Sequence, residues 1–170
     1  MPRQTLTSPD GPVVVSEKTC RALIDIRRDR LLPEVFAPKP LVMARTNADA
    51  LADRFGTQPP DWLTVLDDPA GIDLPERCVT ATASEAATLR LAIALPASVV
   101  LIENPIKERA KLSFIKCEGT VSILVSAYRL GLLSAVRPMV KALRALGHAD
   151  VLPDDAMLEA LWTALDKLDV

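Results

Sequence analysis

The sequence has little of what several common kinds of active site require. Histidine occurs once in 170 residues, as His148, so a histidine metal pair or a Ser-His-Asp triad is hard to assemble. Its position after Gly147, at a predicted helix end, favours a helix-end or surface role. The cysteines are only three, an odd number, and form no CxxC pair: Cys20, Cys78 and Cys117. This argues against a disulfide framework or a zinc site and favours a reducing cytoplasm.

Long apolar runs and glycine-rich loops are missing as well. No stretch of about 18 apolar residues is present, and residues 1–12 contain no signal-peptide core, so we expect a soluble protein without a membrane partner. The absence of a phosphate-binding glycine loop and of a nucleophile elbow counts against other doubly wound hydrolases. Because the net charge is only −2, any nucleic-acid binding needs a local basic patch.

What the chain does contain is enough apolar material for one compact core. Hydrophobic residues make up 49% of the sequence, which suits a single domain of this length. Residues 1–12 are polar and contain Pro and Gly, so we expect a flexible lead followed by one domain over 13–170. Aromatic residues make up only 4%, and Trp62 and Trp162 are therefore expected to pack in the protein rather than to stack on bases.

Short β-rich runs alternate with helical patterns along the chain. Parallel strands are predicted by apolar, β-branched runs at 13–15, 41–43, 62–66 and 98–102. Residues 67–78 have the composition of a loop. Helices are predicted by spacing and composition over 19–32, 48–55, 85–95, 106–114, 120–132, 137–146 and 153–168. This alternation predicts a mainly parallel sheet with helices on both faces, and the last two helices covering one side.

Caps and breakers set the expected helix ends. Pro33 closes the first helix, and Gly56 ends the second. Thr46 or Asn47 is the expected cap of the second helix, and Ser84 that of the third. Five further residues fit helix boundaries: Pro96 as a stop, Pro138 and Pro153 in first turns, and Asp154 with Asp155 at a positive helix N-terminus.

Acidic residues stand where a helix begins and where a strand ends. Glu85 opens the helix in SEAATLRLAIAL, while Glu103 and Asn104 come directly after the apolar strand at 98–102. In an open parallel sheet the carboxyl ends of the strands meet at one edge, which gathers such oxygens. Hard oxygen ligands at close quarters suit a divalent cation. This edge is the candidate active site.

The residues from about Ser84 to Leu161 resemble the PIN-like family described as predicted nucleic-acid-binding proteins containing a PIN domain. The likeness lies in SEA at 84–86, the acidic pair at 103–104, Arg109 with Ala110, Gly119 with Thr120, and the block GLLSAVRPMVKALRALG. The N-terminal half is similar more weakly, through VVVSEKTC and ALADRFGTQPPDW.

The resemblance implies a PIN-like three-layer α/β/α sandwich with a mainly parallel central sheet. In that family carboxylates from strand ends hold one or two Mg²⁺ or Mn²⁺ ions, which lower the pKa of an attacking water and stabilise the leaving oxygen in phosphodiester hydrolysis. Many PIN-fold proteins are toxins of toxin–antitoxin pairs. The resemblance therefore suggests two kinds of partner, RNA and an antitoxin or other protein. The apolar last helices suggest a third, a second copy of the chain in a homodimer.

The family's carboxylate positions transfer unevenly to this chain. An alignment anchored on Cys20 places Glu17 at the first position, normally Asp, with Ser16 as the alternative register. The second position, a Glu in the family, falls on Ala50. The third matches as Glu85, and the fourth, an Asp pair, is replaced by Glu103-Asn104.

The resemblance thus assigns roles that the structure can locate. It implies three catalytic carboxylates, Glu17, Glu85 and Glu103, which would hold the metal together with Asn104. Nucleic-acid contacts are expected from Thr19, Lys107 and Arg109.

Two functions follow as hypotheses. The first is a PIN-like metal-dependent ribonuclease, plausibly a toxin, motivated by the three glutamates. The second is a catalytically degenerate PIN-like binding or assembly module, motivated by Ala50 and Asn104, where carboxylates are missing.

Overall fold

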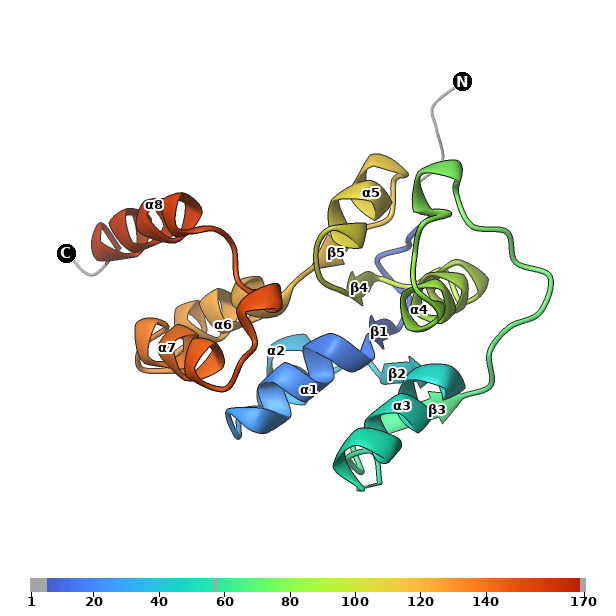
Figure 1. The fold of residues 1–170 in the computed structure, drawn as a ribbon, viewed down its shortest axis with the longest axis horizontal. Helices are drawn as coiled ribbons and strands as arrows, with labels where there is room; N and C mark the ends of the chain where they lie inside the picture. Colours follow the sequence, from blue (N-terminus) through green and yellow to red (C-terminus); the bar gives the residue numbers. More distant parts are fainter. Residues whose placement is uncertain (1–5, 57, 169–170) are drawn as a thin grey trace.

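A five-stranded, all-parallel sheet forms the centre of the protein, as the computed structural model describes it over residues 6–56 and 58–168 (Figure 1). The strands lie in the order β3-β2-β1-β4-β5. Their bounds are β1 Val13–Val15, β2 Leu41–Ala44, β3 Leu63–Leu66, β4 Val99–Leu101 and β5 Cys117–Glu118. In the central ladder Val14 pairs with Val42 on one side and with Val100 on the other.

Helices cover both faces of this sheet. Their bounds are α1 Glu17–Asp25, α2 Leu31–Phe36, α3 Arg45–Phe55, α4 Ala83–Ala94, α5 Ile106–Leu112, α6 Thr120–Arg129, α7 Arg137–Ala145 and α8 Asp155–Asp166, with short 3-10 turns η1 Glu76–Cys78 and η2 Ala149–Val151. Because side chains of a strand alternate between faces, Val13 and Val15 join a core with α1, α3 and α6–α8, whereas Val14 joins a core with α4 and α5. The expected three-layer α/β/α sandwich is confirmed.

The order of the strands determines where a site can form. From β1 the chain winds outward through β2 to β3, and it then returns to place β4 and β5 on the other side of β1. Helices therefore leave the carboxyl ends of β1 and β4 in opposite directions, which opens a crevice between them. Residues that directly follow β1 and β4 meet in this crevice.

The helix predicted over 19–32 is two helices, so that prediction is wrong. The first, α1, ends in a Schellman-type turn in which the N–H of Arg28 donates to the C=O of Leu23 and the N–H of Arg27 donates to the C=O of Ile24. Arg27 occupies the left-handed region there, with φ 57°. Pro33 lies in the first turn of α2, where its missing N–H has no intrahelical partner to lose.

Two predicted helix caps are also wrong. Thr46 and Asn47 lie inside α3, which begins at Arg45, and Gly56 ends it in a left-handed conformation as expected. Ser84 lies in the first turn of α4, where Thr82 is the N-cap. Both side chains named as caps in α3 have tertiary hydrogen-bond partners instead, which local sequence rules do not take into account.

Smaller differences occur toward the C-terminus. The two-residue strand β5 was not predicted, the helix expected over 120–132 ends at Arg129, and Pro153 precedes the N-cap Asp154 of α8. His148 does lie at a helix end, but it is buried rather than on the surface, with Nε2 2.5 Å from Asp25 Oδ2. Among the described residues no helix has the length and apolar content needed to cross a membrane.

Candidate functional site

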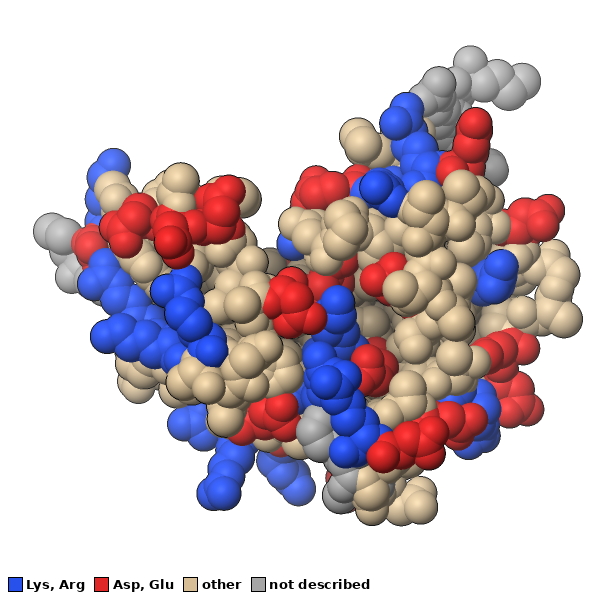
Figure 2. All heavy atoms as spheres, viewed as in Figure 1, with Lys and Arg blue, Asp and Glu red and all other residues tan. Residues whose placement is uncertain are grey.

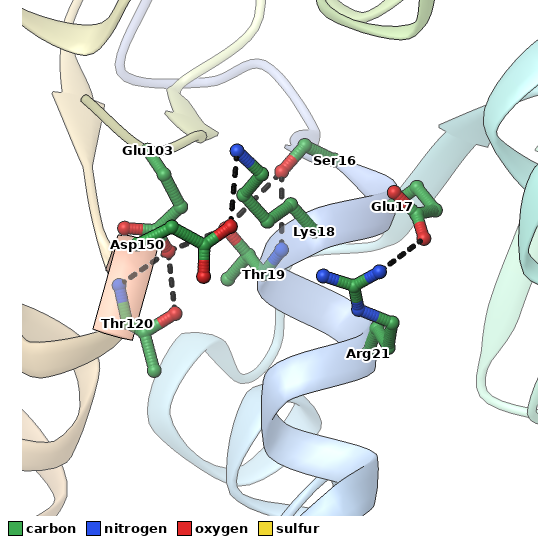
Figure 3. Close-up of polar contacts among 8 residues, drawn as sticks. All are labelled: Ser16, Glu17, Lys18, Thr19, Arg21, Glu103, Thr120 and Asp150. Carbon is green, nitrogen blue, oxygen red and sulfur yellow. Dashed lines mark hydrogen bonds and ion pairs between the residues drawn. The ribbon is translucent and has the colours of Figure 1, made fainter. Parts of the chain in front are cut away.

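Glu103 is the centre of a buried polar cluster at the crevice between β1 and β4. It follows β4 by two residues and is only 5% exposed. Its Oε1 accepts a hydrogen bond from the Thr19 hydroxyl at 2.9 Å and one from the backbone N–H of Thr120 at 2.8 Å. The Thr120 hydroxyl donates to the same oxygen. Three donors therefore converge on one carboxylate oxygen (Figure 3).

The cluster continues through the first residue after β1. Ser16 is the N-cap of α1, and its Oγ accepts from the backbone N–H of Thr19. The Ser16 hydroxyl also lies 3.1 Å from Thr19 Oγ1, to which it donates while Thr19 donates onward to Glu103. We call Ser16, Thr19, Glu103 and Thr120 the Glu103 cluster. It ties the starts of α1 and α6 to the end of β4.

Glu103 serves as the N-terminal cap of α6. The N-cap residue, Gly119, has no side chain, so the first N–H of the helix, that of Thr120, is satisfied by the distant carboxylate. A Cβ at position 119 would lie 2.8 Å from Glu103 Oε2 and 3.1 Å from Lys107 Nζ. Glycine at this position lets α6 approach the carboxylate closely.

Burial raises the pKa of Glu103 above its ordinary value of 4.5. The hydrogen bonds from Thr120 and Thr19 and the charge of Lys107 lower the pKa and so partly oppose this effect. The carboxylate is thus a desolvated group whose charge is compensated by protein donors, the arrangement that a buried ionisable side chain requires.

Glu17 lies beside this cluster but turns away from it. Its Oε1 is 3.7 Å from Arg21 Nη1, one helical turn along α1 (Figure 3). Burial raises the pKa of Glu17, while the positive charges of Arg54 and Lys18 lower it. Ser16, by contrast, hydrogen-bonds to Thr19, which in turn donates to Glu103. At this position the geometry favours the Ser16 register over the Glu17 register.

The side chain of Glu85 forms a capping box with Thr82 at the start of its own helix. Its Oε2 accepts from the backbone N–H of Thr82 at 3.0 Å, and its own N–H donates to the Thr82 hydroxyl at 3.3 Å. A side chain folded back in this way holds the start of α4.

Asn47 has a structural role at the site that the sequence did not predict, since the residue was expected only as a possible helix cap. It is fully buried, its Oδ1 accepts the backbone N–H of Glu17 at 2.8 Å, and its Nδ2 donates to the C=O of Ser84 at 2.9 Å. One amide therefore joins the starts of α1 and α4 through α3. The sequence shows only that Asn47 is polar and precedes the apolar Ala48, and this pattern is equally typical of a helix cap.

All three glutamates border one small cavity. Its volume is about 170 Å³, and its lining comprises Ser16, Glu17, Lys18, Asn47, Thr82, Ser84, Glu85, Ile102 and Glu103. Cations lie around it: Lys18 pairs with Asp150 at 3.3 Å, and Arg21 faces Glu17. Figure 2 shows blue and red side chains interleaved in this part of the surface, near the start of α1.

The remaining predicted residues lie around the neighbouring side of the cluster. Asn104 is exposed and, with Glu103 and Lys107, lines a second cavity of about 240 Å³ between α5 and the segment that leads into α8. Arg109 lines neither cavity described here, and it donates to the Thr80 hydroxyl on the other side of α5. The structure therefore brings Thr19 and Lys107 to Glu103 but not Arg109.

These side chains do not fit an octahedral magnesium or manganese centre. Over residues 6–56 and 58–168 no three His, Cys, Asp or Glu side chains are grouped so that they could hold a metal ion. Ser16 and Ala50 offer no carboxylate, and Oε1 of Glu103 already accepts three hydrogen bonds. Since Mg²⁺ needs several free oxygens at about 2.1 Å, the donor set is insufficient.

Comparison with known proteins gave one family match. A family model described as a PIN domain matches residues 57–149, which is more than half of the chain and includes Glu85, Glu103 and Thr120. No curated protein and no solved structure matches the chain.

Proposed function

Because the chain belongs to the PIN-domain family, we propose that it is a binding or assembly module of this family that has lost metal-dependent hydrolysis. The observation that carries the proposal is the environment of Glu103. In this environment the strand-end carboxylate acts as a buried cap that holds α1 and α6 to the sheet.

The cost of using Glu103 as a metal ligand supports this view. Coordination through Oε1 would displace the Thr19 hydroxyl or the two donors of Thr120, leaving buried polar groups unpaired. Its Oε2 lies on the side of Gly119, where Lys107 Nζ also approaches. A tethered ammonium in that place opposes the approach of a divalent cation.

The ribonuclease hypothesis keeps one observation in its favour, since Glu17, Glu85 and Glu103 border the same cavity. Calorimetric titration with Mn²⁺ and an RNA cleavage assay with Mn²⁺ separate the two functions. We expect no Mn²⁺ binding at millimolar concentration, and no cleavage above that of the Glu85→Gln variant. Micromolar binding, or Mn²⁺-dependent cleavage that Glu85→Gln removes, would establish the nuclease and reject the module.

A restoration experiment tests why hydrolysis is lost. The variant S16D/A50E/N104D places carboxylates at three positions where the family pattern has them and this chain does not. We expect it to bind Mn²⁺ at least tenfold more tightly than the wild type, a difference of about 1.4 kcal/mol. The matched control S16N/A50Q has nearly the same side-chain volumes and adds no charge. If the restored variant folds but binds no better than this control, missing ligands are not the reason.

The binding part of the proposal concerns RNA first. The cavity beside Glu103 has Lys107 and Lys111 on its α5 wall, which could contact phosphates. Fluorescence anisotropy with a labelled single-stranded RNA, compared between the wild type and K107E/K111E, tests this. Equal affinities would exclude RNA binding through Lys107 and Lys111. An assembly role is tested by light scattering on the purified chain, which distinguishes monomer from homodimer.

The three cysteines are free and buried, which supports our proposal of a reducing, cytoplasmic setting.

A further inference from the structure

A cavity of about 360 Å³ lies between α7 and α8, the last two helices of the described chain (Figure 1). Side chains of both helices line it: Arg137, Val140, Lys141 and Arg144 from α7, and Asp155, Leu158, Glu159 and Trp162 from α8. We call it the α7–α8 cavity. It is separate from the two cavities that border Glu103, because none of its lining residues lines either of them.

Ion pairs close the interface between α7 and α8 at both ends. Arg144 Nη2 lies 3.1 Å from Asp155 Oδ1, and Arg137 Nη2 lies 3.2 Å from Asp166 Oδ2. The start of one helix therefore faces the end of the other, so the two helices are antiparallel. Figure 2 shows red side chains on the α8 side of this lobe and blue ones on the α7 side. Exposed pairs of this kind add little stability, but they define the register of the two helices.

Two opposite charges in the middle of this interface are left without a charged partner. Lys141 of α7 and Glu159 of α8 lie between the two ion pairs, and both line the cavity. Neither forms an ion pair with any side chain of residues 6–56 and 58–168. The α7–α8 cavity therefore has an unpaired cation on one wall and an unpaired carboxylate on the other.

Apolar side chains make up much of the remaining lining. Val140 and Leu158 are each only 4% exposed, so they belong to the packed part of the interface. The indole of Trp162 is held by Arg137, whose guanidinium carbon lies 5.2 Å from the ring centroid. A concave site with apolar walls and a few charged groups is the usual form of a small-molecule site, and a volume above about 300 Å³ is sufficient for one.

We propose that the α7–α8 cavity binds a free amino acid with an apolar side chain. Its α-carboxylate would pair with Lys141, its α-ammonium would pair with Glu159, and its side chain would cover the apolar lining. A ligand with charges of only one sign is disfavoured, because cations and carboxylates both line the cavity. A free amino acid carries both charges and an apolar group in a molecule small enough for this volume. This inference does not depend on whether the chain binds or hydrolyses RNA.

The direct test is a titration with L-phenylalanine. In the variant Trp62→Phe, Trp162 is the only tryptophan, so its fluorescence reports on the cavity. We expect a Kd below about 1 mM. In the wild type, NMR shifts should map to residues 137–144 and 155–162. Absence of binding, or shifts confined to other surfaces, would overturn the proposal.

Two analogues distinguish a free amino acid from the end of a peptide. N-acetyl-L-phenylalanine lacks the ammonium group, as the last residue of a peptide does, and L-phenylalaninamide lacks the carboxylate, as the first residue does. We expect each to bind at least tenfold more weakly than L-phenylalanine, because each leaves one charged wall of the cavity unpaired. If either analogue binds as tightly as L-phenylalanine, the ligand is a peptide terminus and the proposal is wrong.

Two variants assign the charges. Lys141→Gln should weaken L-phenylalanine binding at least tenfold but leave L-phenylalaninamide binding unchanged, whereas Glu159→Gln should leave N-acetyl-L-phenylalanine binding unchanged. Both should keep the wild-type urea midpoint, since neither side chain is buried or ion-paired. The matched controls Lys116→Gln and Glu76→Gln neutralise exposed charges outside the cavity and should not alter binding. Equal losses in the controls, or equal losses for both analogues in each variant, would refute the assigned roles.

Discussion

Removing one hydroxyl from the Glu103 cluster should destabilise the protein without changing its shape. Thr120→Val keeps the β-branched form of a fully buried residue and keeps the backbone N–H that donates to Glu103, but it deletes the hydroxyl donor. A hydrogen bond to a charged group contributes about 1.5–3 kcal/mol. Because that donor cannot be replaced by water at a site with 5% exposure, we expect the upper part of this range at neutral pH.

Urea unfolding followed by circular dichroism measures the effect. With a slope of about 2 kcal/mol/M, the midpoint should fall by roughly 1 M. Thr19→Val should have a similar effect because it deletes another donor to the same oxygen. The double variant should deviate from additivity by about 0.5–3 kcal/mol, since both hydroxyls act on one carboxylate. Thr163→Val, which alters an exposed hydroxyl of α8 that donates to a backbone carbonyl, is the matched control.

The result that would refute this reasoning is a Thr120→Val midpoint equal to that of Thr163→Val. Glu103 would then be poorly held by its donors, and its carboxylate would be free for a ligand. The proposal that hydrolysis is lost depends on the opposite result.

Four other changes have expected outcomes. Burial raises the pKa of Glu103 above 4.5, so the folded protein binds this proton more tightly than the unfolded chain does. The resulting stabilisation is complete below about pH 4.5 and is lost as the pH rises through the raised pKa. Urea midpoints should therefore fall with rising pH more in the wild type than in Glu103→Gln. Asn47→Ala should lower the free energy of unfolding by about 2–4 kcal/mol in urea titrations, because two buried backbone groups lose their partners. Gly119→Ala should lower the Tm, since its Cβ would meet the Glu103 carboxylate at 2.8 Å; an unchanged Tm would show that the carboxylate moves freely. Arg27→Gly should instead stabilise the protein by about 1 kcal/mol in the same titrations, because glycine suits φ 57°.

The sandwich could be predicted from the sequence because its strands are short apolar runs that local rules recognise. The run at 13–15 is a strand with the predicted bounds, and that at 41–43 extends by only one residue. The helix boundaries that were predicted wrongly are those where the expected capping side chain has a hydrogen-bond partner elsewhere in the fold. Asn47, for example, was a reasonable helix cap locally, but its amide is used by the backbone of Glu17 and Ser84, which are remote in sequence.

The candidate site could be located from the sequence but its use could not. Strand-end residues Glu103 and Ser16 do meet at the crevice, as the parallel topology requires. Whether a carboxylate faces a ligand or protein donors depends on the hydroxyls around it. Thr120 was noted only for its place in a family motif, and nothing in its spacing reveals that it donates twice to residue 103.

The capping of α6 by a residue outside the helix has a consequence for how the chain assembles. Thr19 and Glu103 are separated by 84 positions, so their hydrogen bond closes a long loop. The pairing of β1 with β4 must offset the entropic cost of closing this loop. Before those strands pair, the N–H of Thr120 at the start of α6 has no carboxylate to accept it. We therefore expect the C-terminal helices to become stable only after the sheet has formed, which places the last third of the polypeptide late in folding.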